Sequence, residues 1–81
     1  MYLELITPEK KVYEGEVISA GFPGTLGSFE VLKNHAPIIS SLAKGAVKLK
    51  TNDGVITYLI DGGVVEVLEN KIVILAEKII E

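Results

Sequence analysis

The segment from Gly24 to Pro37 contains the residues whose types and spacing come closest to a chemical site. Gly24 and Gly27 form a GxxG pattern, which occurs in loops that clamp RNA and in loops that bind phosphate. An RNA-clamping loop needs flanking helices, and a phosphate loop needs a Lys-Ser/Thr pair followed by a helix. The segment has neither context, so the two glycines indicate a tight turn.

His35 is the only histidine, and the chain has no cysteine. A metal site and a thiol nucleophile are therefore not expected, and His35 is expected to make structural or interface hydrogen bonds. Most of the glutamates alternate with apolar residues, as they do on solvated strand faces: Glu4, Glu14, Glu16, Glu66, Glu69 and Glu77. We therefore expect no catalytic, metal-binding or cofactor-binding residue.

The composition describes a small acidic protein with enough apolar residues for a core. The 81 residues are 48% hydrophobic with a net charge of −3, which favours one folded domain spanning residues 1–81. Nucleic-acid binding is not expected, because the eight basic residues are scattered and tryptophan is absent. No apolar run approaches the ~20 residues of a membrane helix, and no secretory signal opens the chain, so direct membrane insertion is not expected.

Alternation of apolar and polar residues predicts a series of short strands. Leu3 and Leu5 share one face of Tyr2–Ile6, and Ser28–Leu32 alternates in the same way. A strong hairpin signal, Asn52-Asp53-Gly54, lies between two further alternating runs. The sequence predicts an all-β fold, a flattened β-sandwich or barrel of about eight to ten short strands with little or no helix.

Prolines and glycines are expected to end or interrupt several of these strands. Phe22-Pro23-Gly24 should close one strand. Ser40, Ser41 and Gly45 limit any helix after Pro37, so Pro37–Leu42 is expected to be a strand, and a separate alternating run begins at Ala46. Asp61-Gly62-Gly63 is expected to form a bend or a bulge. The apolar run within Lys71–Glu77 predicts a strand that is buried on both faces.

A lipoyl- or biotin-carrier domain is an alternative of the same size and fold class. Those domains present the modified lysine at an exposed hairpin tip. Here Lys48 and Lys50 lie on the strand before the tip at Asn52–Gly54, which counts against a carrier. A mass increase on either lysine after expression in a lipoylating or biotinylating host would favour it.

The sequence also resembles a known family, the epsilon subunit of F-type ATP synthase, over essentially the whole chain. The matching blocks are Leu3–Glu9 with Val12–Val17; then Pro23, Gly24, Gly27, Phe29, Val31, Leu32 and His35–Pro37, followed by Leu42 and Gly45; then Asp61–Val67, Asn70, Ile72 and Ile74–Ala76. Two departures stand out. Glu30 replaces a usual glycine, and Lys33-Asn34 replaces a frequent Pro-Gly, where Asn34 can keep the turn.

The resemblance implies a non-catalytic subunit of the central stalk, with the gamma subunit and the c-subunit ring as partners. It would couple proton-driven rotation to ATP synthesis as part of the F1 sector, at the cytoplasmic face of the bacterial inner membrane. The residues that it implies for partner binding are Thr25, Ser28, Glu30, His35 and Ser40. Gly24, Gly27 and Pro37 would shape the loop, and Phe29 would anchor it in the core.

Members of this family usually continue into a C-terminal helical hairpin, which contains the inhibitory function and any nucleotide site. The present sequence ends at Glu81. The expectation is therefore that this chain couples without inhibiting by that route, and that it binds no nucleotide and no other cofactor.

Overall fold

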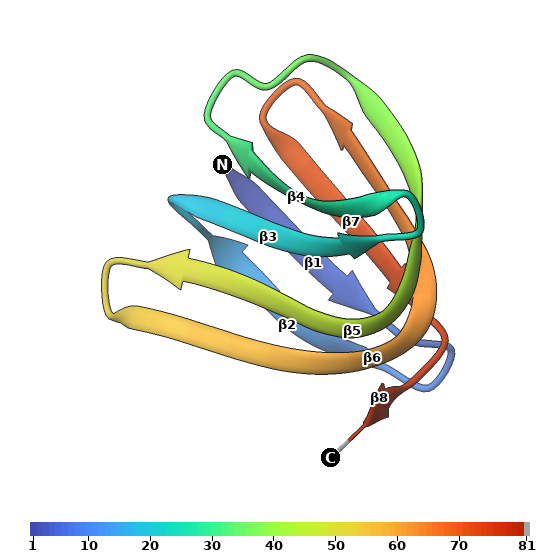
Figure 1. Ribbon diagram of the computed structural model, residues 1–81. Coiled ribbons are helices and arrows are strands. Elements are labelled where there is room, and N and C mark those ends of the chain that lie inside the picture. The colour runs from blue at the N-terminus through green and yellow to red at the C-terminus, as the bar shows by residue number, and fades with distance from the viewer. Residues whose placement is uncertain (81) are drawn as a thin grey trace.

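The computed structural model describes residues 1–80, and every regular element in that range is a β-strand (Figure 1). The strands are β1 (Tyr2–Ile6), β2 (Lys11–Glu16), β3 (Ser19–Gly24), β4 (Gly27–Leu32), β5 (Ile38–Thr51), β6 (Gly54–Leu68), β7 (Lys71–Ala76) and β8 (Ile79–Ile80). They form one sheet in the order β2-β1-β7-β6-β5-β3-β4, with β8 also pairing β6. All pairings are antiparallel except β1 with β7.

Two long strands, β5 and β6, convert this one sheet into two layers. Their antiparallel register is constant from Ile38↔Val67 to Thr51↔Gly54. The part of β6 before Asp61 pairs β8, and the part from Gly63 onward pairs β7. Figure 1 shows both strands curving from one layer to the other. One layer contains β2, β1 and β7, the other contains β3 and β4, and the long strands belong to both.

The core lies between the layers and is built by the alternating residues that the sequence predicts. Leu3 and Leu5 in β1, and Val65 and Val67 in β6, are almost completely buried. The other large, fully buried side chains are Val31, Val47, Leu49, Ile60, Ile72 and Ile74. Burying an aliphatic side chain of this size stabilises the fold by roughly 1.5–3 kcal/mol. The predicted all-β sandwich is therefore confirmed, with two long bent strands among the short ones.

The glycines at the bend do not interrupt either long strand. Gly45 lies within β5 opposite Ile60, so the predicted separation of two strands at this point is wrong. At Asp61–Gly63 the constant register excludes an inserted residue opposite β5, so the predicted bend is present without a bulge. Gly62 and Gly63 have φ values of 103° and 154°, which allow the backbone to turn there.

Two further predictions about strands are corrected. β3 continues through Pro23 to Gly24, because the β3–β5 ladder is irregular between Gly21 and Gly24 and the missing N–H of proline breaks no regular pairing. β7 is buried on one face only, since Leu75 is 54% exposed. Within residues 1–80, no helix is long and apolar enough to cross a membrane.

Candidate functional site

The β3–β4 hairpin places the Gly24–Leu32 segment along an outer strand of one layer. Its ladder runs from Ser19↔Leu32 to Gly24↔Gly27, so Thr25 and Leu26 form the tip. Leu26 is fully exposed at this tip, a position that sequence reasoning did not single out. The Thr25 amide donates to the Ser41 carbonyl at 3.2 Å, and the two hydroxyls lie 2.8 Å apart. The tip is therefore tied to β5.

Close approach at the base of the tip explains the GxxG spacing. A Cβ added at Gly24 would lie 2.6 Å from the Gly27 carbonyl oxygen and 2.9 Å from the Phe29 ring. Gly27 has a φ of 134°, which disfavours any larger residue. Phe29 packs on Phe22 with ring centroids 5.4 Å apart and contacts the core cluster. Backbone geometry and one aromatic contact thus define the hairpin's path.

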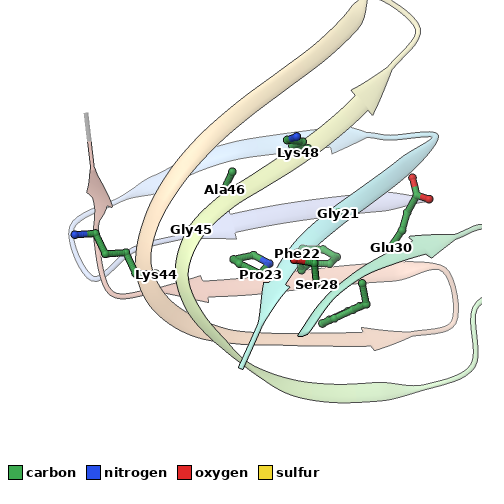
Figure 2. Close-up of a pocket in the computed structure, with 10 residues that line it drawn as sticks. Gly21, Phe22, Pro23, Ser28, Glu30, Lys44, Gly45, Ala46 and Lys48 are labelled. Atoms are coloured by element: carbon green, nitrogen blue, oxygen red, sulfur yellow. The ribbon is translucent and has the colours of Figure 1, made fainter. Parts of the chain in front are cut away.

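A pocket of about 630 Å³ opens where the β3–β5 ladder is irregular (Figure 2). Gly21 lines it, and Glu30 on β4 and Lys48 on β5 both lie opposite this glycine in the two ladders. Ser28 and Lys44 also line the pocket. Figure 2 shows Glu30 and Lys44 on opposite sides of it. An exposed acid and exposed lysines around an open hollow suit contact with a partner's polar side chains.

The turn after β4 contains His35. The His35 amide donates to the Leu32 carbonyl at 3.1 Å, and Asn34 has a φ of 65°. This is the position of a four-residue turn that requires a positive φ in type II geometry, where asparagine substitutes well for glycine. The expected turn is therefore confirmed. His35 is half-buried, with Nδ1 2.6 Å from the Ala36 carbonyl oxygen, and Pro37 is exposed just before β5.

The residues implied for partner binding do not converge on one point. Thr25 and His35 lie at opposite ends of β4, which at ~3.3 Å per residue separates them by roughly 20 Å. Ser28 and Glu30 are exposed between them. Ser40 is half-buried and its hydroxyl donates to the Ser41 carbonyl, whereas Ser41 itself is exposed. The arrangement is an extended contact surface rather than a cleft.

A second surface, the outer face of β5, β6 and β7, was missed by sequence reasoning. Ile39 is 73% exposed, Leu75 54%, Leu68 50% and Val64 42%. Leu75 lies opposite Val64 in one ladder and opposite Ile6 in the other, so apolar side chains form a continuous row. The sequence feature that points to this face is the apolar run of β7, from which burial on both faces is predicted. We call this set of residues the apolar face.

A charged cluster borders the apolar face on β1. The Glu4 carboxylate forms ion pairs with Lys11 Nζ at 2.8 Å and with Lys71 Nζ at 3.6 Å. Lys11 Nζ also forms an ion pair with the Glu14 carboxylate at 3.0 Å. The hydrogen bond from Lys11 is the largest cause that holds the pKa of Glu4 below its ordinary value, and Lys71 adds to it, while desolvation opposes both. Within residues 1–80, no three His, Asp or Glu residues are grouped as metal ligands would be.

Comparison with known proteins decides the family. The model of the β-sandwich domain of ATP synthase delta/epsilon chains matches residues 1–81. The chain belongs to this family. It is 41% identical over 78 residues to the ATP synthase epsilon chain of Chlorobaculum tepidum, covering 95% of this chain and 89% of that one. It is 40% identical to the epsilon chain of Nitratidesulfovibrio vulgaris, covering 95% of this chain but only 58% of that one.

Two solved structures with low sequence identity to this chain share its fold. A chain in the Euglena gracilis mitochondrial ATP synthase structure (OSCP/F1/c-ring) superposes with a TM-score of 0.89 at 21% identity, covering 96% of this chain and 51% of that one. A chain in the Tetrahymena thermophila mitochondrial ATP synthase structure (central stalk/c-ring) gives 0.85 at 17% identity, covering 99% and 65%. The predicted resemblance to epsilon subunits is thereby confirmed, and the family assignment favours it over a carrier domain.

Proposed function

We propose that this chain is a non-catalytic central-stalk subunit of an F-type ATP synthase, which binds the gamma subunit and the c ring and couples proton-driven rotation to ATP synthesis. It would lie at the cytoplasmic face of the bacterial membrane as a peripheral part of the F1 sector. The observation that supports this best is the membership of residues 1–81 in the delta/epsilon family, combined with two exposed surfaces that lack reactive groups.

The tip of the β3–β4 hairpin is the surface proposed for the c ring. Leu26 projects fully exposed from a turn whose path is fixed by Gly24 and Gly27. Thr25 and Ser28 add hydroxyl groups beside it, and Glu30 adds a charge farther along β4. A rigid tip with one apolar and several polar groups fits the polar loops that the family's ring presents.

The apolar face is the surface proposed for gamma. Ile39, Leu68 and Leu75 are each at least half exposed, and Glu66 and Lys71 lie among them on the same side of the sheet. Protein interfaces that form between separately folded subunits combine apolar and polar groups in this way. Neighbouring exposed apolar side chains on one face are also a feature of protein interaction sites.

Reconstitution into an ATP synthase that lacks its epsilon subunit tests the proposal. Leu26→Asp should weaken binding to the c ring, and Leu75→Asp should weaken binding to gamma, since each inserts a charge into an apolar contact. Val55→Asp is the matched control, because Val55 is 64% exposed but lies beside the β5–β6 turn, opposite Lys50 of β5, away from both surfaces. Affinity and proton-driven ATP synthesis are measured with each variant.

We expect the wild type and Val55→Asp to restore coupled synthesis, and the two other variants to lose affinity by at least about tenfold, a loss of ~1.4 kcal/mol. The result that contradicts the proposal is an assembled complex that stays uncoupled with the wild type. Equal affinities for all four proteins would remove the assignment of the two surfaces while leaving the subunit's role intact.

A further inference from the structure

Two asparagines that are 36 residues apart in sequence are joined by two hydrogen bonds. The Asn34 backbone N–H donates to Asn70 Oδ1 at 2.7 Å, and Asn70 Nδ2 donates to Asn34 Oδ1 at 3.0 Å. Both residues have positive φ angles, 65° for Asn34 and 60° for Asn70. We call this pair the asparagine clamp. Glycine tolerates such a backbone equally well, but it has no side-chain amide to donate and accept as Asn70 does, or to accept as Asn34 Oδ1 does.

The two sides of the clamp differ in how firmly the rest of the fold fixes them. Asn70 belongs to the two-residue turn between Leu68 and Lys71, and its carbonyl accepts the Tyr2 amide at 3.0 Å. The β6–β7 hairpin and β1 therefore fix its position. Asn34 lies in the 33–37 segment, between the end of β4 and the start of β5 and outside the ladder of either strand. Figure 1 shows this connection passing beside the β6–β7 turn.

We propose that Asn70 is a positioning residue for the partner-binding segment 33–37, and that it acts through Asn34. The clamp holds the turn that presents His35 and Pro37 against the fixed β6–β7 hairpin, so the segment is ordered before a partner arrives. Ordering a loop in advance removes part of the entropy cost of binding. This inference rests on the proposed function, because the partners of His35 would be the gamma subunit and the c ring that the family resemblance implies. It names a residue outside the segment as the one that prepares it.

Glycine substitutions test the hydrogen bonds of the clamp without changing the backbone of either turn, because glycine adopts both positive φ angles readily. Asn34→Gly retains the backbone bond to Asn70 Oδ1 and loses the second bond. Asn70→Gly loses both. Glu69→Gly is the matched control: Glu69 lies in the same turn with a φ of 51°, and it contributes no atom to the clamp. The three variants therefore form a graded series of one, zero and two remaining bonds.

Two measurements are made on each protein: the ¹⁵N order parameter of the His35 amide, and the affinity for the cognate gamma–c-ring complex. We expect order parameters near 0.85 in the wild type and Glu69→Gly, and values below about 0.6 in Asn70→Gly, with Asn34→Gly between them. Affinity should fall in the same order, by about three- to tenfold for Asn70→Gly, as for the loss of one or two neutral hydrogen bonds.

Each other outcome overturns a distinct part of the reasoning. An ordered His35 amide in Asn70→Gly shows that the clamp does not position the segment. A mobile segment with unchanged affinity shows that the clamp is structural only, and overturns the positioning role. If the wild type itself does not bind the complex, the proposed function fails together with this role, whereas the order parameters still report whether the clamp orders the turn.

Discussion

Replacing Gly63 by alanine should destabilise the fold more than any other glycine-to-alanine change outside the β3–β4 hairpin. Gly63 lies at the bend of β6 with a φ of 154°, and an added Cβ would be 2.3 Å from the Leu75 carbonyl oxygen and 2.9 Å from Ala76 Cα. The unfavourable backbone costs about 1–2 kcal/mol. The overlap is with backbone atoms of β7, so relieving it requires a shift of the strand, at about 1–3 kcal/mol.

The expected total is about 2–5 kcal/mol, against an overall stability of roughly 4–12 kcal/mol for a chain of this length. Urea unfolding followed by far-ultraviolet circular dichroism measures the difference. Gly54→Ala is the control, because Gly54 also has a positive φ, 126°, but has open space around an added Cβ. It should cost only the backbone part, about 1–2 kcal/mol. If Gly63→Ala costs no more than Gly54→Ala, the close approach of β6 to β7 at the bend does not constrain the fold.

Two other predictions concern the charged cluster and the hairpin. Glu4→Gln should lower the free energy of unfolding at neutral pH and make that free energy depend less on pH in acid. The pKa of Glu4 is held below 4.5, so the ionised carboxylate stabilises the fold above that pH, and this stabilisation is lost as the pH falls through the lowered pKa. Urea midpoints at pH 7, 5 and 3 measure this, and an acid slope equal to that of the wild type would contradict it. Phe29→Ala should cost about 2–3 kcal/mol through the lost Phe22 contact, whereas Leu26→Ala at the exposed tip should stay within about 0.5 kcal/mol; equal thermal midpoints for these two variants would refute the anchoring role of Phe29.

The sequence predicts the strands well where apolar and polar residues alternate, because alternation reports directly which face is buried. Leu3 and Leu5 point into the core as their spacing requires. The β7 run has no polar residue between Ile72 and Ala76, so its sequence does not distinguish one buried face from two. The difference depends on what covers the outer face, and in this structure Leu75 is left exposed there.

Glycines limit sequence reasoning for a related reason. Glycines such as Gly45 and Gly63 are common where strands end, yet these two lie inside strands that bend from one layer to the other. The same conformational freedom serves both purposes, and only the pairing partners decide between them. Similarly, the hydrogen bonds between Asn34 and Asn70 form only because two turns that are distant in sequence meet in space. No local sequence pattern predicts that contact.

The extent of the candidate site also depends on tertiary structure. The residues from Thr25 to His35 are close in sequence, and the family resemblance groups them in one segment. The extended strand β4 separates Thr25 from His35, so this one segment contributes to two separate regions of the surface. The apolar face combines side chains from β5, β6 and β7, which are consecutive strands joined by hairpin turns, and the register of their ladders brings these side chains together.

β5 connects the two proposed contact surfaces over a short distance. Ser41 in this strand bonds the hairpin tip through its carbonyl and its hydroxyl, and Ile39, two residues earlier, belongs to the apolar face. At ~3.3 Å per residue, Ser41 and Ile39 are less than about 10 Å apart along β5, so the hairpin tip is linked to the apolar face through a short length of strand. The strand is paired there with β6 at Ser41↔Val64 and with β3 at Leu42↔Gly24, so neighbouring ladders share the load. The proposed mechanical coupling of two partners needs a well-supported connection between the contact surfaces rather than a reactive group, and the ladders on both sides of β5 provide that support around Ser41.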